Sequence, residues 1–216
     1  MAQEKLFQEL TPHFPPRKTD EITMSPDSTH TEQPLPAGAA SDGRVAADDL
    51  PAPYAGPRPQ DALPELFIQD AYANDDPRLW VPLSPGRWSR PLCLNVSAGY
   101  WVHLNRVVGG GLLSRHRHPA PVHGFVITGR WRYLERDWIA EPGSYLYEPP
   151  GDIHTLVVEP DCDEMITLFH NAGALIYCDA DGNTVGTTDV FDRIDACRKH
   201  FTEVGLGADY VERFIR

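Results

Sequence analysis

GGLLSRHRHPAPVHGFVITG (residues 110–129) and GSYLYEPPGDIH (residues 143–154) are the stretches that decide the fold of this chain. His116 and His118 are two residues apart, and side chains with that spacing on a strand project from the same face. His154 follows a Pro-Pro-Gly turn at the entrance to another apolar run, where a closed sheet can bring it opposite the first pair. The sequence therefore predicts a metal held by these three imidazoles, with open positions left for chemistry.

Short runs with alternating apolar residues surround these stretches and are separated by Gly, Pro and Asp or Asn turns. The expected strands are Leu92–Ser97, Tyr100–Val107, Leu112–Arg117, Val122–Thr128, Arg130–Arg136, Ser144–Glu148, Thr155–Glu159, Met165–His170 and Ala174–Cys178. Asp189–Val204 carries an apolar stripe at helical spacing and ends at Gly205, and Ala208–Arg216 is expected to form a second, shorter helix. Many short strands followed by helices indicate a small antiparallel barrel with a helical appendage.

The N-terminal part of the chain has a different composition. Eleven of the 21 prolines fall within the first 64 residues, and residues 1–62 carry hardly any apolar periodicity. Such a segment buries too little surface to offset its ordering entropy, so it is predicted to be a disordered extension. Folded structure is expected to begin near Leu66, within a single domain of residues 63–216.

Charge and cysteine content exclude several classes of protein. The formal net charge is −12 and no Lys/Arg-rich run is present, so neither nucleic acid nor an anionic membrane is an expected partner. The start, MAQEKLFQEL, has no apolar h-region and no apolar stretch approaches 18 residues, so neither a signal peptide nor a membrane span is expected. The four cysteines are scattered, which is typical of reduced residues in a cytoplasmic protein.

The spacing of glycines and histidines adds a family resemblance. The first stretch follows G-x5-H-x-H-x4-E-x5/6-G, and the second follows G-x5-P-x-G-x2-H. These are the two cupin motifs, and the chain resembles that superfamily. The resemblance implies a mainly all-β fold, a cupin double-stranded β-helix (jelly-roll) barrel, here with C-terminal helices and a disordered N-terminal extension.

One position departs from the cupin pattern. His123 stands where most cupins have a glutamate ligand, so it is interpreted either as a fourth ligand or as a residue beside the ligands that hydrogen-bonds the substrate. Glu148, six residues before His154, is expected to point into the barrel and to share the catalytic role with His123. His103 and His170 are interpreted as core or surface histidines. Some of four alternating aromatic residues are candidates for an aryl-accepting pocket, namely Trp131, Tyr133, Tyr145 and Tyr147.

A closer resemblance covers about Pro64 to Arg216. The run His116–Val158 and the tail Cys197–Arg216 resemble the 2,4'-dihydroxyacetophenone dioxygenase family. The resemblance implies ferrous iron on three histidines, which fall on His116, His118 and His154. It also implies cleavage of the C–C bond between a ketone carbonyl and the adjacent oxygen-bearing carbon. Acetylacetone dioxygenase is a more distant relative, whose glutamate corresponds in spacing to Glu148. The ChrR-type anti-sigma factors, also related, use a zinc-binding cupin to regulate a partner protein.

Elementary chemistry agrees with this expectation. Three neutral imidazoles leave the full +2 charge on iron, which favours an anionic bidentate ligand such as the enolate of a hydroxyketone. His123 or Glu148 could then take the proton. We therefore expect an Fe(II)-dependent dioxygenase acting on a small aromatic α-hydroxyketone and O2. A β-diketone dioxygenase and a non-catalytic zinc-binding ChrR-like sensor are the alternatives.

Two further points stay open at this stage. Imidazole ligands alone do not distinguish iron from zinc, nickel or manganese. The resemblance to small cupins, which often pair through their strands, predicts a homo-oligomer, either a dimer or a tetramer.

Overall fold

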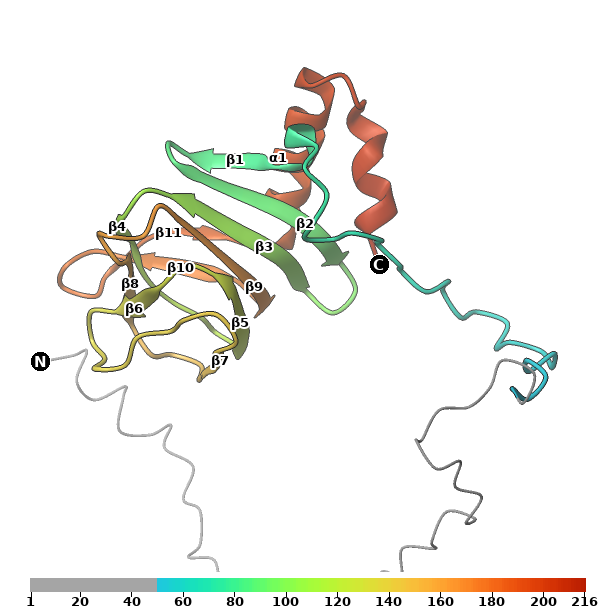
Figure 1. The fold of residues 1–216 in the computed structure, drawn as a ribbon, viewed down its shortest axis with the longest axis horizontal. Coiled ribbons are helices and arrows are strands. Elements are labelled where there is room, and N and C mark those ends of the chain that lie inside the picture. Colours follow the sequence, from blue (N-terminus) through green and yellow to red (C-terminus); the bar gives the residue numbers. More distant parts are fainter. Residues whose placement is uncertain (1–49) are drawn as a thin grey trace, which may run out of the picture. The chain divides into compact units, whose positions relative to one another are not determined.

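Two antiparallel sheets form the body of the protein, as the computed structural model, which describes residues 50–216, shows in Figure 1. Residues 58–216 make one compact unit. Most of the predicted N-terminal extension lies outside the described residues, so the boundary after residue 62 stays a prediction. Among the described residues, no helix is both long and apolar enough to cross a membrane.

The larger sheet has six strands and the smaller sheet has five. In spatial order the larger sheet consists of β1 (Val81–Ser84), β2 (Arg87–Asn95), β3 (Tyr100–Val108), β9 (Glu164–Ala172), β5 (Val122–Thr128) and β7 (Tyr145–Glu148). The smaller sheet consists of β11 (Thr184–Thr188), β10 (Leu175–Cys178), β4 (Gly111–Arg117), β8 (His154–Val158) and β6 (Trp131–Tyr133). Neighbours in space are often distant in sequence, as β3 and β9 are. This arrangement confirms the predicted mainly-β fold with C-terminal helices.

Some element boundaries differ from the sequence prediction. Leu66 lies in irregular chain, and the first regular element among the described residues is the 3-10 helix η2 (Pro77–Leu79). Strand β2 starts at Arg87, before the expected Leu92, because Pro91 is accommodated next to a bulge in the ladder with β3. The expected run 130–136 is a strand only in β6, since a turn follows in which Arg136 N–H donates to the Tyr133 carbonyl.

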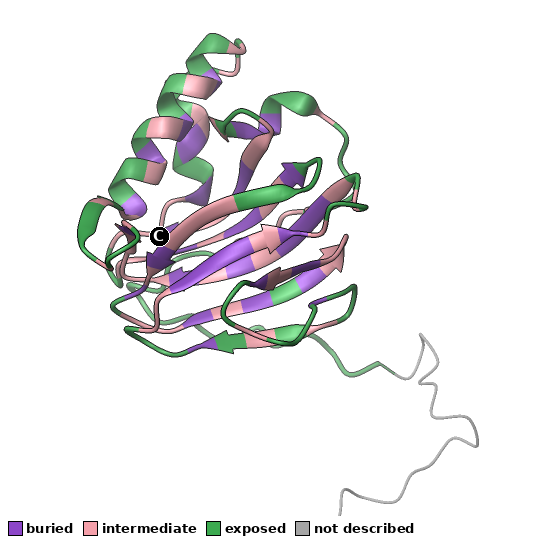
Figure 2. Cartoon of the chain, turned by 90° about the vertical axis from the view of Figure 1, so that its left-hand side faces the viewer, coloured by how far each residue is buried: buried purple, intermediate pink, exposed green. Residues whose placement is uncertain are grey.

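Alternation along the strands places the main core between the two sheets. Val126 of β5, Trp131 of β6 and Val158 of β8 are fully buried there. Buried and less buried residues alternate along several strands, as Figure 2 shows. The turn from β5 to β6 needs Gly129, because its φ is +78° and a Cβ atom would lie 2.3 Å from the Glu164 carbonyl oxygen.

The C-terminal helices cover one end of the larger sheet (Figure 1). Helix α1 (Val190–Glu203) begins with a capping box between Asp189 and Asp192, and the 3-10 helix η3 (Ala208–Phe214) packs beside it. Ile194 and other buried residues of α1 form a second core with β1, β2 and η3. This second core fixes how α1 stands over the sheet.

Phe201→Ala is expected to lower the free energy of unfolding by about 3–5 kcal/mol, because Phe201 is fully buried and its ring meets that of Tyr210 at a centroid distance of 4.9 Å. Urea unfolding followed by tryptophan fluorescence measures this change. Phe191→Ala is the matched control on the same helix, where the side chain is exposed, and it is expected to stay within about 0.5 kcal/mol of wild type. Equal effects of the two substitutions would contradict a shared core.

Candidate metal centre

Strand pairing brings residues from both histidine-containing stretches together. His116 in β4 lies directly across from His154, the first residue of β8. His118 follows the end of β4, and its carbonyl oxygen accepts a hydrogen bond from the Gly151 N–H in the turn before β8 (2.8 Å). Glu148 is the last residue of β7. The ends of three strands therefore direct four side chains into one place.

The distances within this group suit a single metal ion. The Nε2 atoms of His116 and His154 are 3.2 Å apart, and Glu148 Oε2 lies 3.2 Å from His118 Nε2 and 3.3 Å from His154 Nε2. Ligand atoms about 2.1 Å from a common ion are themselves separated by roughly 3.0–3.4 Å. All four potential ligand atoms lie within 4.8 Å of one another, and all four residues are buried. The group could thus bind a metal.

Hydrogen bonds hold two of the rings in the orientation that a metal needs. The Nδ1 atom of His116 lies 3.1 Å from the Ser114 carbonyl oxygen, and that of His118 lies 3.2 Å from the Ala174 carbonyl oxygen. A carbonyl partner makes Nδ1 the protonated nitrogen, which leaves Nε2 as the lone-pair donor toward the group. His154 Nδ1 is buried and has no hydrogen-bond partner within residues 50–216.

Tyr133 of β6 supports the group from the side. Its hydroxyl donates a hydrogen bond to Glu148 Oε1, and its ring stacks on that of His154 with centroids 4.1 Å apart. Burial, with the nearby Glu148 charge, raises the pKa of Tyr133 well above its usual range, so it stays a phenol and a donor.

Burial decides the protonation of His116. Burial, followed by the charges of His154 and His118, lowers the pKa of His116 to about 3, so its imidazole is neutral, as a metal ligand must be. Burial by itself would raise the pKa of Glu148, but hydrogen bonds and charge from His118 and His154 outweigh that effect and lower it. The carboxylate is therefore ionised.

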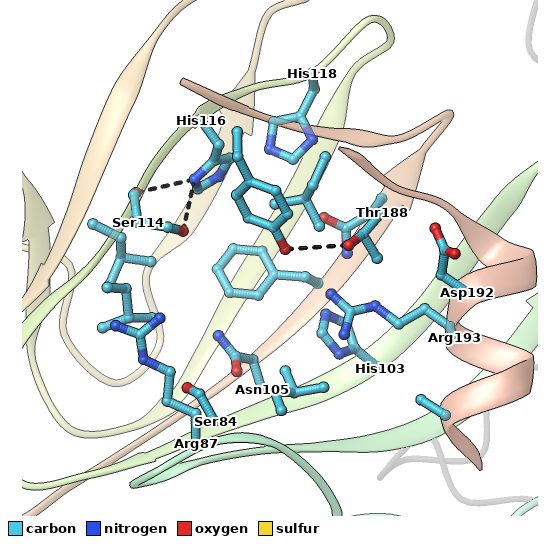
Figure 3. A pocket seen from close by; sticks show the side chains of 18 of the residues that line it. Ser84, Arg87, His103, Asn105, Ser114, His116, His118, Thr188, Asp192 and Arg193 are labelled. Atoms are coloured by element: carbon cyan, nitrogen blue, oxygen red, sulfur yellow. Dashed lines mark hydrogen bonds between the residues drawn. The ribbon is translucent and has the colours of Figure 1, made fainter. Parts of the chain in front are cut away.

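A cavity of about 470 Å³ opens beside the group (Figure 3). Its wall includes His116, His118 and Glu148. Its apolar lining includes Leu113, Leu156, Phe169 and Leu175, and its polar lining includes Arg87, His103, Asn105, Tyr177 and Arg193. The volume and the mixed lining are those of a small-molecule site.

A comparison with protein families extends over this part of the chain. Residues 68–176, just over half of the chain, match the profile of the ChrR cupin-like domain. The chain belongs to this family. None of the curated proteins matches the sequence of this cupin.

Solved structures agree with the assignment of the fold. An RmlC-like cupin protein from Ralstonia eutropha JMP134 is 26% identical with a TM-score of 0.57, and the match covers 59% of this cupin and 83% of that chain. A protein of unknown function with a cupin-like fold from the same organism is 27% identical with a TM-score of 0.53, over 56% and 75% of the two chains. An acetylacetone dioxygenase from Acinetobacter johnsonii is 17% identical with a TM-score of 0.53, over 65% and 99%. At that identity the likeness concerns the fold alone.

His123 of the cupin lies away from the four-residue group. It sits on the outer face of β5, with Nδ1 2.8 Å from the hydroxyl of the exposed Tyr145 and its ring beside those of Tyr147 and His170. Its neighbour Val122 is buried, as alternation requires. The prediction that His123 is a fourth ligand or a substrate contact is therefore corrected: Glu148, and not His123, completes the group.

The aromatic candidates divide between the two faces of the cupin. Trp131 and Tyr133 are buried inside, and Tyr133 lines the cavity, whereas Tyr145 and Tyr147 are exposed outside. This division follows from alternation along β6 and β7.

One histidine set aside at the sequence level proves to line the cavity. His103 of β3 is buried, with Nδ1 2.7 Å from Ser89 Oγ, and burial and the nearby Arg193 charge lower its pKa to about 3. Alternation placed His103 on one face of a strand but could not show that this face borders a cavity. Arg193 comes from helix α1, and no sequence signal connected it to the site.

Proposed function

We propose that this cupin is a non-haem Fe(II)-dependent dioxygenase. It cleaves the C–C bond next to the carbonyl of a small aromatic α-hydroxyketone that resembles 2,4'-dihydroxyacetophenone, giving two carboxylic acids. One observation carries the proposal: three members of the buried four-residue group, His116, His118 and Glu148, line a cavity large enough for such a ketone. A metal held there would be reachable by a substrate, as a catalytic metal must be.

The proposed ligands are the Nε2 atoms of His116, His118 and His154. When bound, ferrous iron would supply an electron-poor centre for the carbonyl and hydroxyl oxygens of the hydroxyketone and for O2. The same imidazoles also accept zinc, nickel or manganese, so iron is part of the proposal. In the reaction, one hydroxyketone and one O2 give one aryl carboxylic acid and one formic acid.

Glu148 is the proposed proton acceptor. Tyr133 holds Oε1 of its carboxylate, which leaves Oε2 directed at the histidine nitrogens, where the substrate oxygens would bind. A carboxylate fixed in that position can take the proton of a substrate hydroxyl or enol as the substrate binds. Leu113, Leu156 and Phe169 would contact the aryl part and exclude water.

Oxygen consumption tests the proposal. Anaerobically purified, Fe(II)-loaded protein is expected to consume one O2 per molecule of 2,4'-dihydroxyacetophenone and to release one formate, whereas zinc-loaded protein consumes none. Acetylacetone in a parallel cell tests the β-diketone alternative, to which the fold of acetylacetone dioxygenase draws attention. The absence of oxygen consumption by the iron-loaded protein with both ketones would contradict the proposal.

A second candidate function rests on a specific distance. Glu148 Oε2 lies 3.2 Å from His118 Nε2 and 3.3 Å from His154 Nε2, about the distance that separates the Nε2 atoms of His116 and His154, so the four residues could close a tetrahedral zinc site. A ChrR-like zinc sensor without turnover would use the group in that way. Zinc that stays bound through purification, together with silence in the oxygen assay, would favour this function.

A further inference from the structure

Two guanidinium groups that the sequence did not connect with the site line the cavity. Arg87 of β2 and Arg193 of α1 both line it, and neither has an ion-pair partner among the described residues (Figure 3). One NH2 group of Arg87 donates to the Leu112 carbonyl oxygen at 2.7 Å. The Nε atom of Arg193 is buried and has no hydrogen-bond partner in the described structure.

The acidic residues of the lining form no ion pair with these cations in the described part of the chain. Glu148 is engaged by the histidines and Tyr133. Asp192 is exposed, and its carboxylate accepts the N–H of Asp189 in the capping box of α1. The lining histidine His103 is neutral near pH 7, since burial lowers its pKa to about 3. The interior therefore presents two guanidinium groups without an ion-pair partner to whatever binds there, while the ionised Glu148 lies with the histidines.

A structural role accounts for only part of the Arg193 side chain. The guanidinium lies over the Trp101 ring, with Cζ 5.6 Å from its centroid, and the Tyr177 hydroxyl is nearby. Stacking on an aromatic ring uses the flat face of the guanidinium and leaves its in-plane N–H donors to other acceptors, of which the Tyr177 hydroxyl is one. Burying those donors without an acceptor is unfavourable, so an acceptor from a ligand would stabilise the arrangement.

From this arrangement we infer that Arg193 selects a ketone with a carboxylate at the end remote from the metal group. The inference deepens the proposed function and rests on it for the ketone end of the ligand. The planar fork of Arg193 would pair with the carboxylate, and Arg87 adds to the positive potential. The substrate class is thus an anionic hydroxyketone, and the neutral 2,4'-dihydroxyacetophenone is expected to bind less tightly than such a substrate.

Calorimetric titration of zinc-loaded protein tests the inference without any turnover. The two probes are 4-(hydroxyacetyl)benzoate and its neutral amide, 4-(hydroxyacetyl)benzamide, which have the same shape. Wild-type protein is expected to bind the carboxylate roughly tenfold to hundredfold more tightly than the amide, as charge-assisted hydrogen bonds do. Arg193→Gln is expected to remove that preference while amide binding stays within about threefold, and Arg193→Lys to restore part of it.

Lys199→Gln is the matched control, because it removes one positive charge from an exposed position of the same helix. It is expected to keep the preference. Equal affinity of wild-type protein for the two probes, no binding of the carboxylate, or a preference that survives Arg193→Gln would each overturn the inference. The wild-type comparison decides the matter even if the Arg193 variant folds poorly.

The outcome is separable from that of the proposed function. A carboxylate preference that depends on Arg193, with no oxygen uptake by the iron form, would leave the inference standing and remove the dioxygenase. Oxygen uptake with neutral ketones, with equal binding of the two probes, would do the reverse.

Discussion

The His154→Ala variant is expected to retain almost no metal and to show no ketone-dependent oxygen uptake. The substitution removes one of three imidazoles, and two imidazoles hold a ferrous ion poorly. It also takes away a neighbour of the buried Glu148 Oε2 and the ring on which Tyr133 stacks. Metal per chain, measured by mass spectrometry after gel filtration, gives the result directly. Unchanged metal content would contradict the assignment of His154 as a metal ligand.

His123→Ala is the matched control, because it removes an imidazole from the outer face of β5. This variant is expected to keep its metal and its activity. Loss of metal from it would restore His123 as a ligand and would contradict the position that the structure gives it.

Glu148→Gln is expected to keep the metal and to lower the rate of ketone cleavage by roughly 10²–10⁴-fold, the contribution typical of a positioned acid or base. The amide has nearly the shape of the carboxylate and can still accept the Tyr133 hydrogen bond, but it cannot take a proton. Initial rates of oxygen uptake and metal content, measured on the same preparation, separate the two effects.

Glu159→Gln provides the comparison, because Glu159 pairs with Arg132 away from the cavity. Its rate is expected to match wild type. If Glu148→Gln instead loses the metal, the glutamate is a ligand, the site is closed by four protein groups, and the zinc sensor becomes the better reading.

The sequence predicted those features that depend on local alternation. His116 precedes His118 by two residues at the end of one strand, and the two side chains share a face. Glu148 lies inside because Tyr147, its neighbour in β7, lies outside. His123 was linked to the site by its position in the cupin motif and not by alternation, and the loop of Pro119, Ala120 and Pro121 separates β4 from β5. Counting residues across such a loop cannot decide which face a side chain occupies.

The cavity lining was beyond sequence reasoning for a different reason. Arg193 lies on a helix whose apolar residues, such as Ile194, could be recognised by their spacing. Its position over the sheet depends on burial against β1, β2 and η3, and the strand residues in this core, such as Val81, are far from the helix in the sequence. His103 belongs to the same case, because a strand pattern does not show what its inner face borders.

The direct pairing of His116 with His154 has a consequence for the dynamics of the smaller sheet. Strand β8 lies in its interior, between β4 and β6, so the two ligands are also opposite rungs of a backbone ladder. With an ion bound, the strands could not part there without pulling two of the proposed ligand atoms away from it. An ion bound at this position would act as a clamp on the ladder and would suppress the local opening through which its amide protons exchange with solvent. Release of the ion and fraying of the sheet are then one thermodynamic event.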